Sequence, residues 1–270
     1  MERRLGLSRD PFSPLADGEL YWESAARGEL RRQLAEQLRS GCSVRLEGTP
    51  GSGRRSLLAR VADELAAGGA PVALLDGPGE ETPEAFLAGL AAAVGANPPS
   101  GAGLLTLAEH LYCRLVDVFC AARPAVVVLP WAPAGDVAEE IGILTELRLL
   151  GRPLVAVAVV GSPALPTGEF ASVAVPELSP DDLCDCLAHR CAAAGRADLL
   201  SPAALEACLA GAPGLPTALR RARALWRARV FASALEALEA PATPTPPPVL
   251  DPAQVEEVRQ LLQSLSPDAL

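Results

Sequence analysis

The chain has 270 residues, which is enough for one large domain or two smaller ones with a sizeable core. Half of its residues are hydrophobic, and its formal charge of −10 disfavours binding to nucleic acid or to an anionic membrane surface. No apolar run reaches the ~20 residues that span a bilayer, and the first residues lack the apolar stretch of a signal peptide. We therefore expect a cytoplasmic protein without a membrane span.

The first two thirds of the chain alternate between predicted helices and strands. Residues 1–25 have no regular pattern, and the next residues form an amphipathic helix over 26–40. Strands are predicted at 43–47, 71–76, 125–129, 154–160 and 171–175, with helices between them at 55–67, from 82 onward, at 104–122 and at 136–150. Strands that alternate with helices are typical of βαβ units. We therefore predict an α/β core with a parallel sheet over residues 1–178.

After residue 178 the pattern indicates helices only. They are predicted at about 179–194, 201–210 and 214–238, and together they form a second, α-helical domain over 179–238. Residues 239–250 are rich in proline and are predicted to be an extended linker. An amphipathic helix is predicted over 251–270, with Asp251 as its N-cap. This helix either docks on a protein partner or folds back on its own domain, and the sequence leaves both open.

A glycine-rich loop follows the first predicted strand. Its glycines have the spacing of the phosphate-binding motif G-x-x-x-x-G-K-[ST], and a predicted helix comes next. Arg54 stands at the lysine position and Arg55 at the hydroxyl position that binds Mg²⁺, while Ser56 is rotated by ~100° on the helix. ATP or ADP binding stays open, but Mg²⁺ binding is not expected. The candidate phosphate site consists of Gly48, Thr49, Pro50, Gly51, Ser52, Gly53, Arg54, Arg55 and Ser56. The alternative is a turn that only joins strand to helix.

ATP hydrolysis also needs acidic residues at the end of the third strand, where an aspartate binds Mg²⁺ and a glutamate often activates water. Pro130 and Trp131 stand there instead, and neither can bind a metal or take a proton. Asp136 follows only beyond Pro133 and Gly135, too far along the chain to replace them without folding back. We therefore predict that the chain has no catalytic residues.

A cysteine–histidine cluster suggests a metal site and an arginine cluster suggests a nucleic-acid site, but the spacing of the residues on a helix does not support either. Cys184, Cys186, His189 and Cys191 are close in sequence, but on a helix the first and last share one face and the other two point roughly the opposite way. No metal site is predicted there. A basic helix with Trp226 could contact nucleic acid, but its arginines spread over several faces, so we expect them to form salt bridges. These are Arg220, Arg221, Arg223, Arg227 and Arg229.

Six segments, in order, give the chain a family resemblance. They are 5–12 (LGLSRDPF), the strand and loop at 44–56, 145–150 (TELRLL), 160–165 (VGSPAL), 175–179 (VPELS) and 214–216 (GLP). In these segments the chain resembles the AAA+ ATPases of the general secretion pathway protein A (ExeA-like) family, which are close to the transposition ATPases. It departs from the family at Arg54, Arg55, Pro130 and Trp131. It also has Thr217 where the family has an arginine.

The resemblance implies a P-loop NTPase fold of the AAA+ type: a parallel five-stranded sheet flanked by helices, an α-helical lid, and ATP between the two. It also implies an oligomer that takes part in assembling envelope machinery. Because the catalytic positions differ, the leading hypothesis is a pseudo-ATPase that acts as scaffold or regulator. Its partner would be a protein, such as an active AAA+ relative or a component of secretion or pilus machinery, in a homo- or hetero-oligomer. The alternatives are a slow, atypical ATP-binding NTPase and a nucleic-acid-associated protein of the transposition type.

Overall fold

The computed structural model describes residues 7–13, 20–75, 77, 82–121, 123–133, 135–161, 164–165, 169–212 and 214–239. The chain divides into two units, Met1–Trp226 and Arg227–Leu270. In the second unit the described residues, 227–239, form the last part of a helix that begins in the first unit. The linker predicted at 239–250 lies outside the described residues apart from Glu239, and the helix predicted at 251–270 lies wholly outside them. The predicted domain boundaries therefore stay predictions.

Five parallel strands form the central sheet of the first unit. They are β1 (Val44–Glu47), β2 (Val72–Leu74), β3 (Ala125–Leu129), β6 (Val155–Val160) and β7 (Ala171–Ala174), in the spatial order β2-β3-β6-β1-β7. Every residue of β3 and β6 is buried, which is why these two segments are unbroken apolar runs. The predicted parallel sheet of five strands is confirmed.

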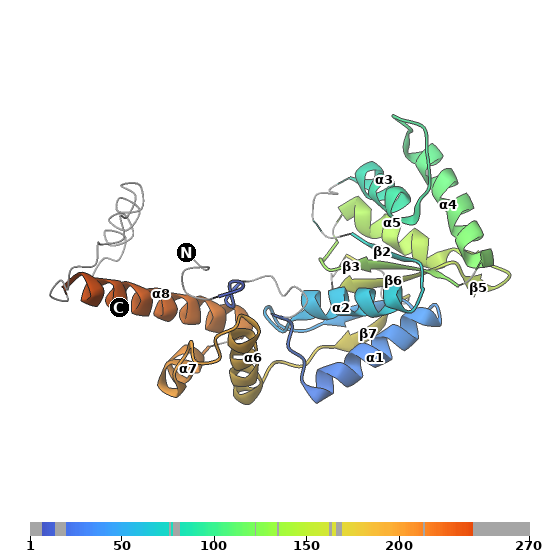
Figure 1. The fold of residues 1–270 in the computed structure, drawn as a ribbon. Coiled ribbons are helices and arrows are strands. Elements are labelled where there is room, and N and C mark those ends of the chain that lie inside the picture. Colours follow the sequence, from blue (N-terminus) through green and yellow to red (C-terminus); the bar gives the residue numbers. More distant parts are fainter. Residues whose placement is uncertain are drawn as a thin grey trace. The chain divides into compact units, whose positions relative to one another are not determined.

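Helices cover both faces of this sheet (Figure 1). On one face, α1 (Ala25–Arg39) and α2 (Arg54–Ala67) pack on the side chains of Val126 and Val128 of β3. On the other, α3 (Pro83–Val94), α4 (Leu104–Ala121) and α5 (Gly135–Glu146) pack on Val127 and Leu129 of the same strand. The alternation of β3 side chains between the two cores follows from the period of two in a strand. Among the described residues, no helix is both long enough and apolar enough to cross a lipid bilayer.

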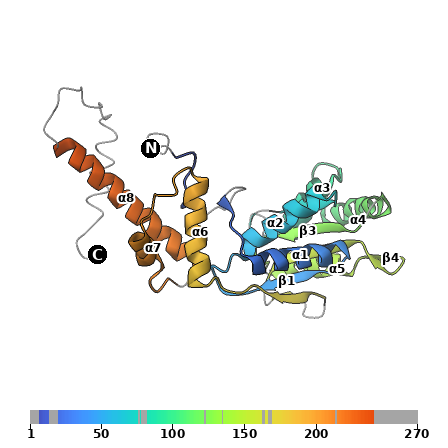
Figure 2. The same cartoon turned by 60° about the horizontal axis from the view of Figure 1, so that its bottom comes forward.

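Three further helices follow the sheet: α6 (Pro180–Ala193), α7 (Pro202–Leu209) and α8 (Leu215–Glu239) (Figure 2). Local sequence sets where two of them begin. Ser179 and Asp182 form a capping box at the start of α6, and Ser201 caps α7 by accepting a hydrogen bond from the Ala204 N–H. In both helices a proline follows the cap, where its missing N–H costs nothing.

The N-terminal segment packs on this helical region although the chain separates them by some 170 residues. Arg190 of α6 is buried, and its guanidinium donates hydrogen bonds to the carbonyl oxygens of Pro11 (3.1 Å), Ser13 (2.8 Å) and Leu20 (3.2 Å). The rings of Phe12 and Trp226 lie 6.0 Å apart between centroids, and both side chains are buried. The segment predicted to be irregular is therefore held in place by the helices that end the first unit.

One predicted element is wrong in its extent. The helix predicted over 136–150 ends at Glu146, and a two-stranded antiparallel hairpin follows, with β4 (Arg148–Leu149) and β5 (Arg152–Pro153). Its turn consists of Leu150 and Gly151, both with positive φ (53° and 77°). The apolar residues of this stretch continue a helical pattern, but they pack on the core as a hairpin, and Leu150 at its tip is 94% exposed.

Candidate functional site

The glycine-rich loop joins the carboxyl end of β1 to the first turn of α2 and closes tightly on its neighbours. A Cβ on Gly48 would lie 2.9 Å from the Val175 carbonyl oxygen, and Gly53 has a φ of 82°. A side chain at either position would therefore meet the backbone or force a strained conformation. The two outer glycines of the motif are required by the geometry of the loop.

The end of this loop has the properties of an anion site. Gly53 caps α2 without a side-chain hydrogen bond, so the first N–H groups of this 14-residue helix have no capping partner. The Ser52 side chain is 3% exposed, and its Oγ has no hydrogen-bond partner among the described residues. A helix N-terminus attracts negative charge, because its unpaired N–H groups and the helix dipole both favour an anion. The residues present therefore fit a phosphate group.

A buried arginine, Arg27, forms hydrogen bonds to the glycine-rich loop. Arg27 lies in the first turn of α1, which Ser24 caps, and its side chain is 6% exposed. Its guanidinium donates hydrogen bonds to the carbonyl oxygen of Ser52 and, at 3.1 Å, to that of Pro176. Burial lowers the pKa of Arg27, since removing the charge from water disfavours it. The loop is thus tied both to α1 and to the segment that leads into α6.

A cleft of about 710 Å³ opens between this loop and the start of α8. Six of the predicted site residues line it: Pro50, Gly51, Gly53, Arg54, Arg55 and Ser56. Gly48, Thr49 and Ser52 do not line it. Loop and helix approach closely, because a Cβ on Gly51 would lie 3.0 Å from Cδ of Pro216. The predicted residues therefore form one wall of a larger site.

The other walls come from residues that the sequence pattern did not identify. Phe12 of the N-terminal segment contributes an aromatic ring, and Leu215 and Leu219 of α8 contribute aliphatic side chains. The remaining lining residues are Ala132, Val160, Gly161, Pro216, Arg220 and Arg223. The sequence signal for these residues was the family resemblance of segments 5–12 and 214–216, but that resemblance did not assign a role to any residue in them. The cleft thus has apolar walls beside a cationic one, as expected of a nucleotide site.

The arginines of α8 have three different surroundings. Arg220 lines the cleft, and its guanidinium donates to Thr217 Oγ1 at 3.3 Å. Arg223 also lines the cleft and forms an ion pair with Asp10. Arg221 instead donates to the carbonyl oxygens of Ala210 and Cys208, at the end of α7. The expectation of salt bridges thus holds for Arg223 alone of these three, and Arg220 belongs to the cleft.

The end of β3 does not supply a metal ligand. Trp131 is buried, and its indole Nε1 donates a 3.0 Å hydrogen bond to the Leu75 carbonyl oxygen, so the side chain turns toward β2. The next residue, Ala132, is the one that lines the cleft. Asp136 is exposed in the first turn of α5 and is not among the cleft residues. No described residue of the cleft wall is acidic, so the residues present do not fit a Mg²⁺ ion, which prefers carboxylate oxygens.

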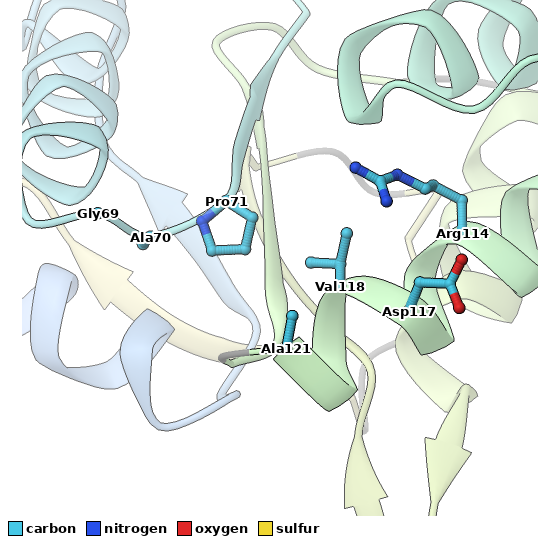
Figure 3. A pocket seen from close by; sticks show the side chains of 7 residues that line it. All are labelled: Gly69, Ala70, Pro71, Arg114, Asp117, Val118 and Ala121. Carbon is cyan, nitrogen blue, oxygen red and sulfur yellow. The ribbon is translucent and has the colours of Figure 1, made fainter.

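A second hollow, of about 320 Å³, lies elsewhere on the molecule (Figure 3). It is lined by residues of α4, including Arg114 and Asp117, and by Gly69, Ala70 and Pro71 of the connection between α2 and β2. Arg114 is already engaged, since its Nε donates to the Val94 carbonyl oxygen at 2.9 Å. The hollow brings together no set of groups with a recognisable chemistry, and the cleft beside the glycine-rich loop is the better candidate site.

The cysteines and the histidine of α6 differ in burial. Cys186 and Cys191 are buried and Cys184 is half-buried, while His189 is exposed. Burial raises the pKa of Cys191 to about 11, and Cys208 of α7 adds to this effect. In the described part of the chain, no three histidine, cysteine or acidic side chains gather where they could hold a metal ion.

Comparisons with known proteins identify the fold. No protein-family model matches the chain, and a sequence comparison with characterised proteins gives no match. Among solved structures, Cdc6p of Pyrobaculum aerophilum matches with a TM-score of 0.65 and 19% identity, over 85% of this chain and 67% of that one. The ORC1 protein of Aeropyrum pernix, solved in complex with DNA, matches with a TM-score of 0.62 and 19% identity, over 95% and 70%. The ORC2 protein of Aeropyrum pernix, solved as ADPNP–ADP complexes, matches with a TM-score of 0.60 and 19% identity, over 84% and 68%.

These neighbours are AAA+ proteins, and the chain has their fold: a parallel five-stranded sheet of the P-loop NTPase type, flanked by helices. At 19% identity the likeness shows the fold alone. It agrees with the AAA+ fold that the sequence resemblance implied. The ExeA-like family itself stays a prediction.

Proposed function

We propose that this chain is a degenerate AAA+ protein of the ExeA-like type that binds a nucleotide without hydrolysing it and acts as a scaffold or regulator. The observation that carries the proposal is the combination of a glycine-rich loop that fits a phosphate with a cleft wall whose described residues include no acid. Nucleotide binding is supported by the uncapped start of α2, by the unpartnered Ser52 Oγ in the glycine-rich loop and by the arginines that line the cleft. One structural neighbour was solved with ADPNP and ADP, which agrees with this proposal.

The chemistry of the described residues supports binding more than turnover. Arg54 and Arg55 offer donors for phosphate oxygens, and Phe12, Leu215 and Leu219 offer apolar contacts for a base. No described side chain of the cleft can take a proton from an attacking water at neutral pH, since the ionisable ones are all arginine. The nucleotide would then act as a ligand that holds the loop and the start of α8 together.

The experiment measures binding and turnover on the same preparation. Isothermal calorimetry with ATP and ADP should give saturable binding, and Arg54→Ala should weaken it about 10-fold or more, because a charge-assisted hydrogen bond contributes about 1.5–3 kcal/mol. Arg60→Ala is the matched control, since Arg60 lies on the same helix but outside the cleft. Phosphate release with Mg²⁺ should stay at the background rate. Turnover that Arg54→Ala abolishes would instead support the slow, atypical NTPase.

The scaffold role needs a protein partner, and an active AAA+ relative or a component of secretion or pilus machinery is the expected class. Co-expression with such a relative, followed by light scattering of the purified mixture, should give a mixed oligomer that hydrolyses ATP only through the relative. Two separate species at all ratios would contradict the scaffold role while leaving nucleotide binding intact.

The nucleic-acid alternative is not favoured. One structural neighbour was solved with DNA, but of the α8 arginines that would form a basic surface, Arg221 and Arg223 are engaged within the first unit. The charge of −10 also opposes binding to a polyanion.

A further inference from the structure

The cleft differs from an ordinary magnesium–nucleotide site in its charge. Arg54, Arg55 and Arg220 line it, and none of the three forms an ion pair with an acidic side chain in the described part of the chain. Arg223 is the one cleft arginine with a carboxylate partner, Asp10. The cleft therefore holds three positive charges that no described acidic side chain compensates.

Among the described residues, the cleft wall offers a cation no carboxylate ligand. Glu47, which precedes the loop, is bound to Arg45 at 3.0 Å and accepts a hydrogen bond from Ser172 Oγ at 2.9 Å. The end of β3 supplies a buried indole. Ser56 contributes a single hydroxyl to the cleft wall, beside the guanidinium-bearing Arg55. A divalent cation would thus meet one hydroxyl and several positive charges, where Mg²⁺ binds best with carboxylates around it.

We infer that this cleft binds the free nucleotide anion in preference to its magnesium complex, and that Mg²⁺ lowers the affinity. The inference rests on the proposed nucleotide binding and names the form of the ligand. Free ATP carries two more negative charges than magnesium–ATP, so it compensates the arginines better. The complex would also bring its metal next to Arg55, which stands at the position where the phosphate-loop motif places a metal-binding hydroxyl.

The test compares ATP affinity by isothermal calorimetry in EDTA and in excess Mg²⁺, with NaCl used to match the ionic strength. We expect the dissociation constant to be about 10-fold or more higher with Mg²⁺. Equal affinities, or tighter binding with Mg²⁺, would overturn the inference while leaving the proposed nucleotide binding in place. Absence of binding in both buffers would instead overturn the proposed function.

Two variants assign the effect to a residue. Arg55→Ser removes the guanidinium and places a hydroxyl at that position, so the ratio of the two dissociation constants should fall toward one. Arg60→Ser removes a positive charge from the same helix outside the cleft, so its ratio should stay that of the unmodified protein. Because Arg55 is exposed, we expect the Arg55→Ser variant to fold normally, so that a change in the ratio of the dissociation constants reports on binding. Circular dichroism checks the fold. An unchanged ratio in Arg55→Ser would refute the role given to Arg55.

Discussion

Arg27 gives the most direct test of how the phosphate loop is held. Replacing it by methionine keeps an unbranched, mainly aliphatic side chain and removes the guanidinium. The carbonyl oxygens of Ser52 and Pro176 then lose their donors, while the hydrocarbon part of the side chain can still pack. Because Arg27 is only 6% exposed, water cannot fully replace those hydrogen bonds. The substitution therefore removes the guanidinium while it keeps most of the aliphatic packing of the side chain.

The loss of stability in Arg27→Met can be estimated from these hydrogen bonds. Two charge-assisted hydrogen bonds contribute about 3–6 kcal/mol together. The charge was partly desolvated, as the lowered pKa of Arg27 indicates, and removing it recovers part of that cost. We expect a net loss of about 2–4 kcal/mol in the free energy of unfolding, which corresponds to a fall in Tm of about 5–15 °C for a protein of this size. Arg27→Lys should lose less stability than Arg27→Met but more than none, because its ammonium can still donate hydrogen bonds but its side chain is one atom too short to reach the position of Nη2.

Urea unfolding followed by circular dichroism measures the change, and nucleotide calorimetry on the folded variant measures its effect on the loop. Arg32→Met is the matched control. Arg32 lies on the same helix with its side chain 64% exposed, and its one ion pair among the described residues is with Glu29, so its loss should cost less than about 0.5 kcal/mol. The reasoning is refuted if Arg27→Met unfolds within 0.5 kcal/mol of the unmodified protein.

Further predictions concern Gly53, Trp131, Leu150 and the cysteines. Gly53→Ala should lower the free energy of unfolding by about 2–4 kcal/mol, because the new Cβ would lie 2.6 Å from Arg27 Nη1 and the backbone φ is 82°. Gly69→Ala is the control: its φ is 74° but no atom lies within 4 Å of the new Cβ, so the loss should be only about 1 kcal/mol. Trp131→Asp should cost about 3–5 kcal/mol and confer no ATPase activity, because that side chain is buried toward Leu75; the appearance of turnover would show that it can reach the cleft. Leu150→Asn should stabilise the protein by about 0.5–1 kcal/mol in thermal unfolding, because asparagine tolerates a φ of 53° better than leucine, and a loss of stability would mean that Leu150 packs. A thiol reagent at pH 8 should modify Cys42, Cys113 and Cys120 at once, but Cys186, Cys191 and Cys208 only on unfolding. Since the folded-state pKa of Cys191 is raised to about 11, the stability that its neutral thiol contributes should be present below pH ~9 and fall as the pH rises from there toward 11.

The sequence by itself determined the parts of this protein that depend on local pattern. Unbroken apolar runs such as Val155–Val160 predicted buried parallel strands, and the spacing of Gly48 and Gly53 between a strand and a helix predicted the phosphate loop. Pro130 and Trp131 marked the end of β3 as a place without an acid. These features are readable because each is set by residues adjacent in the chain, through strand periodicity, turn geometry or side-chain chemistry.

The local sequence pattern gave a wrong prediction where a helix and a hairpin can both bury the same apolar residues. The apolar residues after Ile141 continue a helical repeat as far as Leu150, and a helix to that residue was the natural prediction. The backbone instead leaves the helix at Glu146, and Leu147 accepts a hydrogen bond from the Leu154 N–H at 3.0 Å. The same side chains reach the core from a hairpin, so burial could be predicted there and the element could not.

Only the tertiary structure decided what surrounds the phosphate loop. Arg27 and Arg190 look like ordinary surface arginines of amphipathic helices, yet both are buried and bind backbone carbonyl oxygens of distant segments. Phe12 and Arg220 are separated by more than 200 residues and line the same cleft. No periodicity records such pairs, because they exist only after the N-terminal segment packs on α6 and α8. The glycine-rich loop could therefore be predicted from the sequence, whereas the residues of the other cleft walls are brought together only by the tertiary structure.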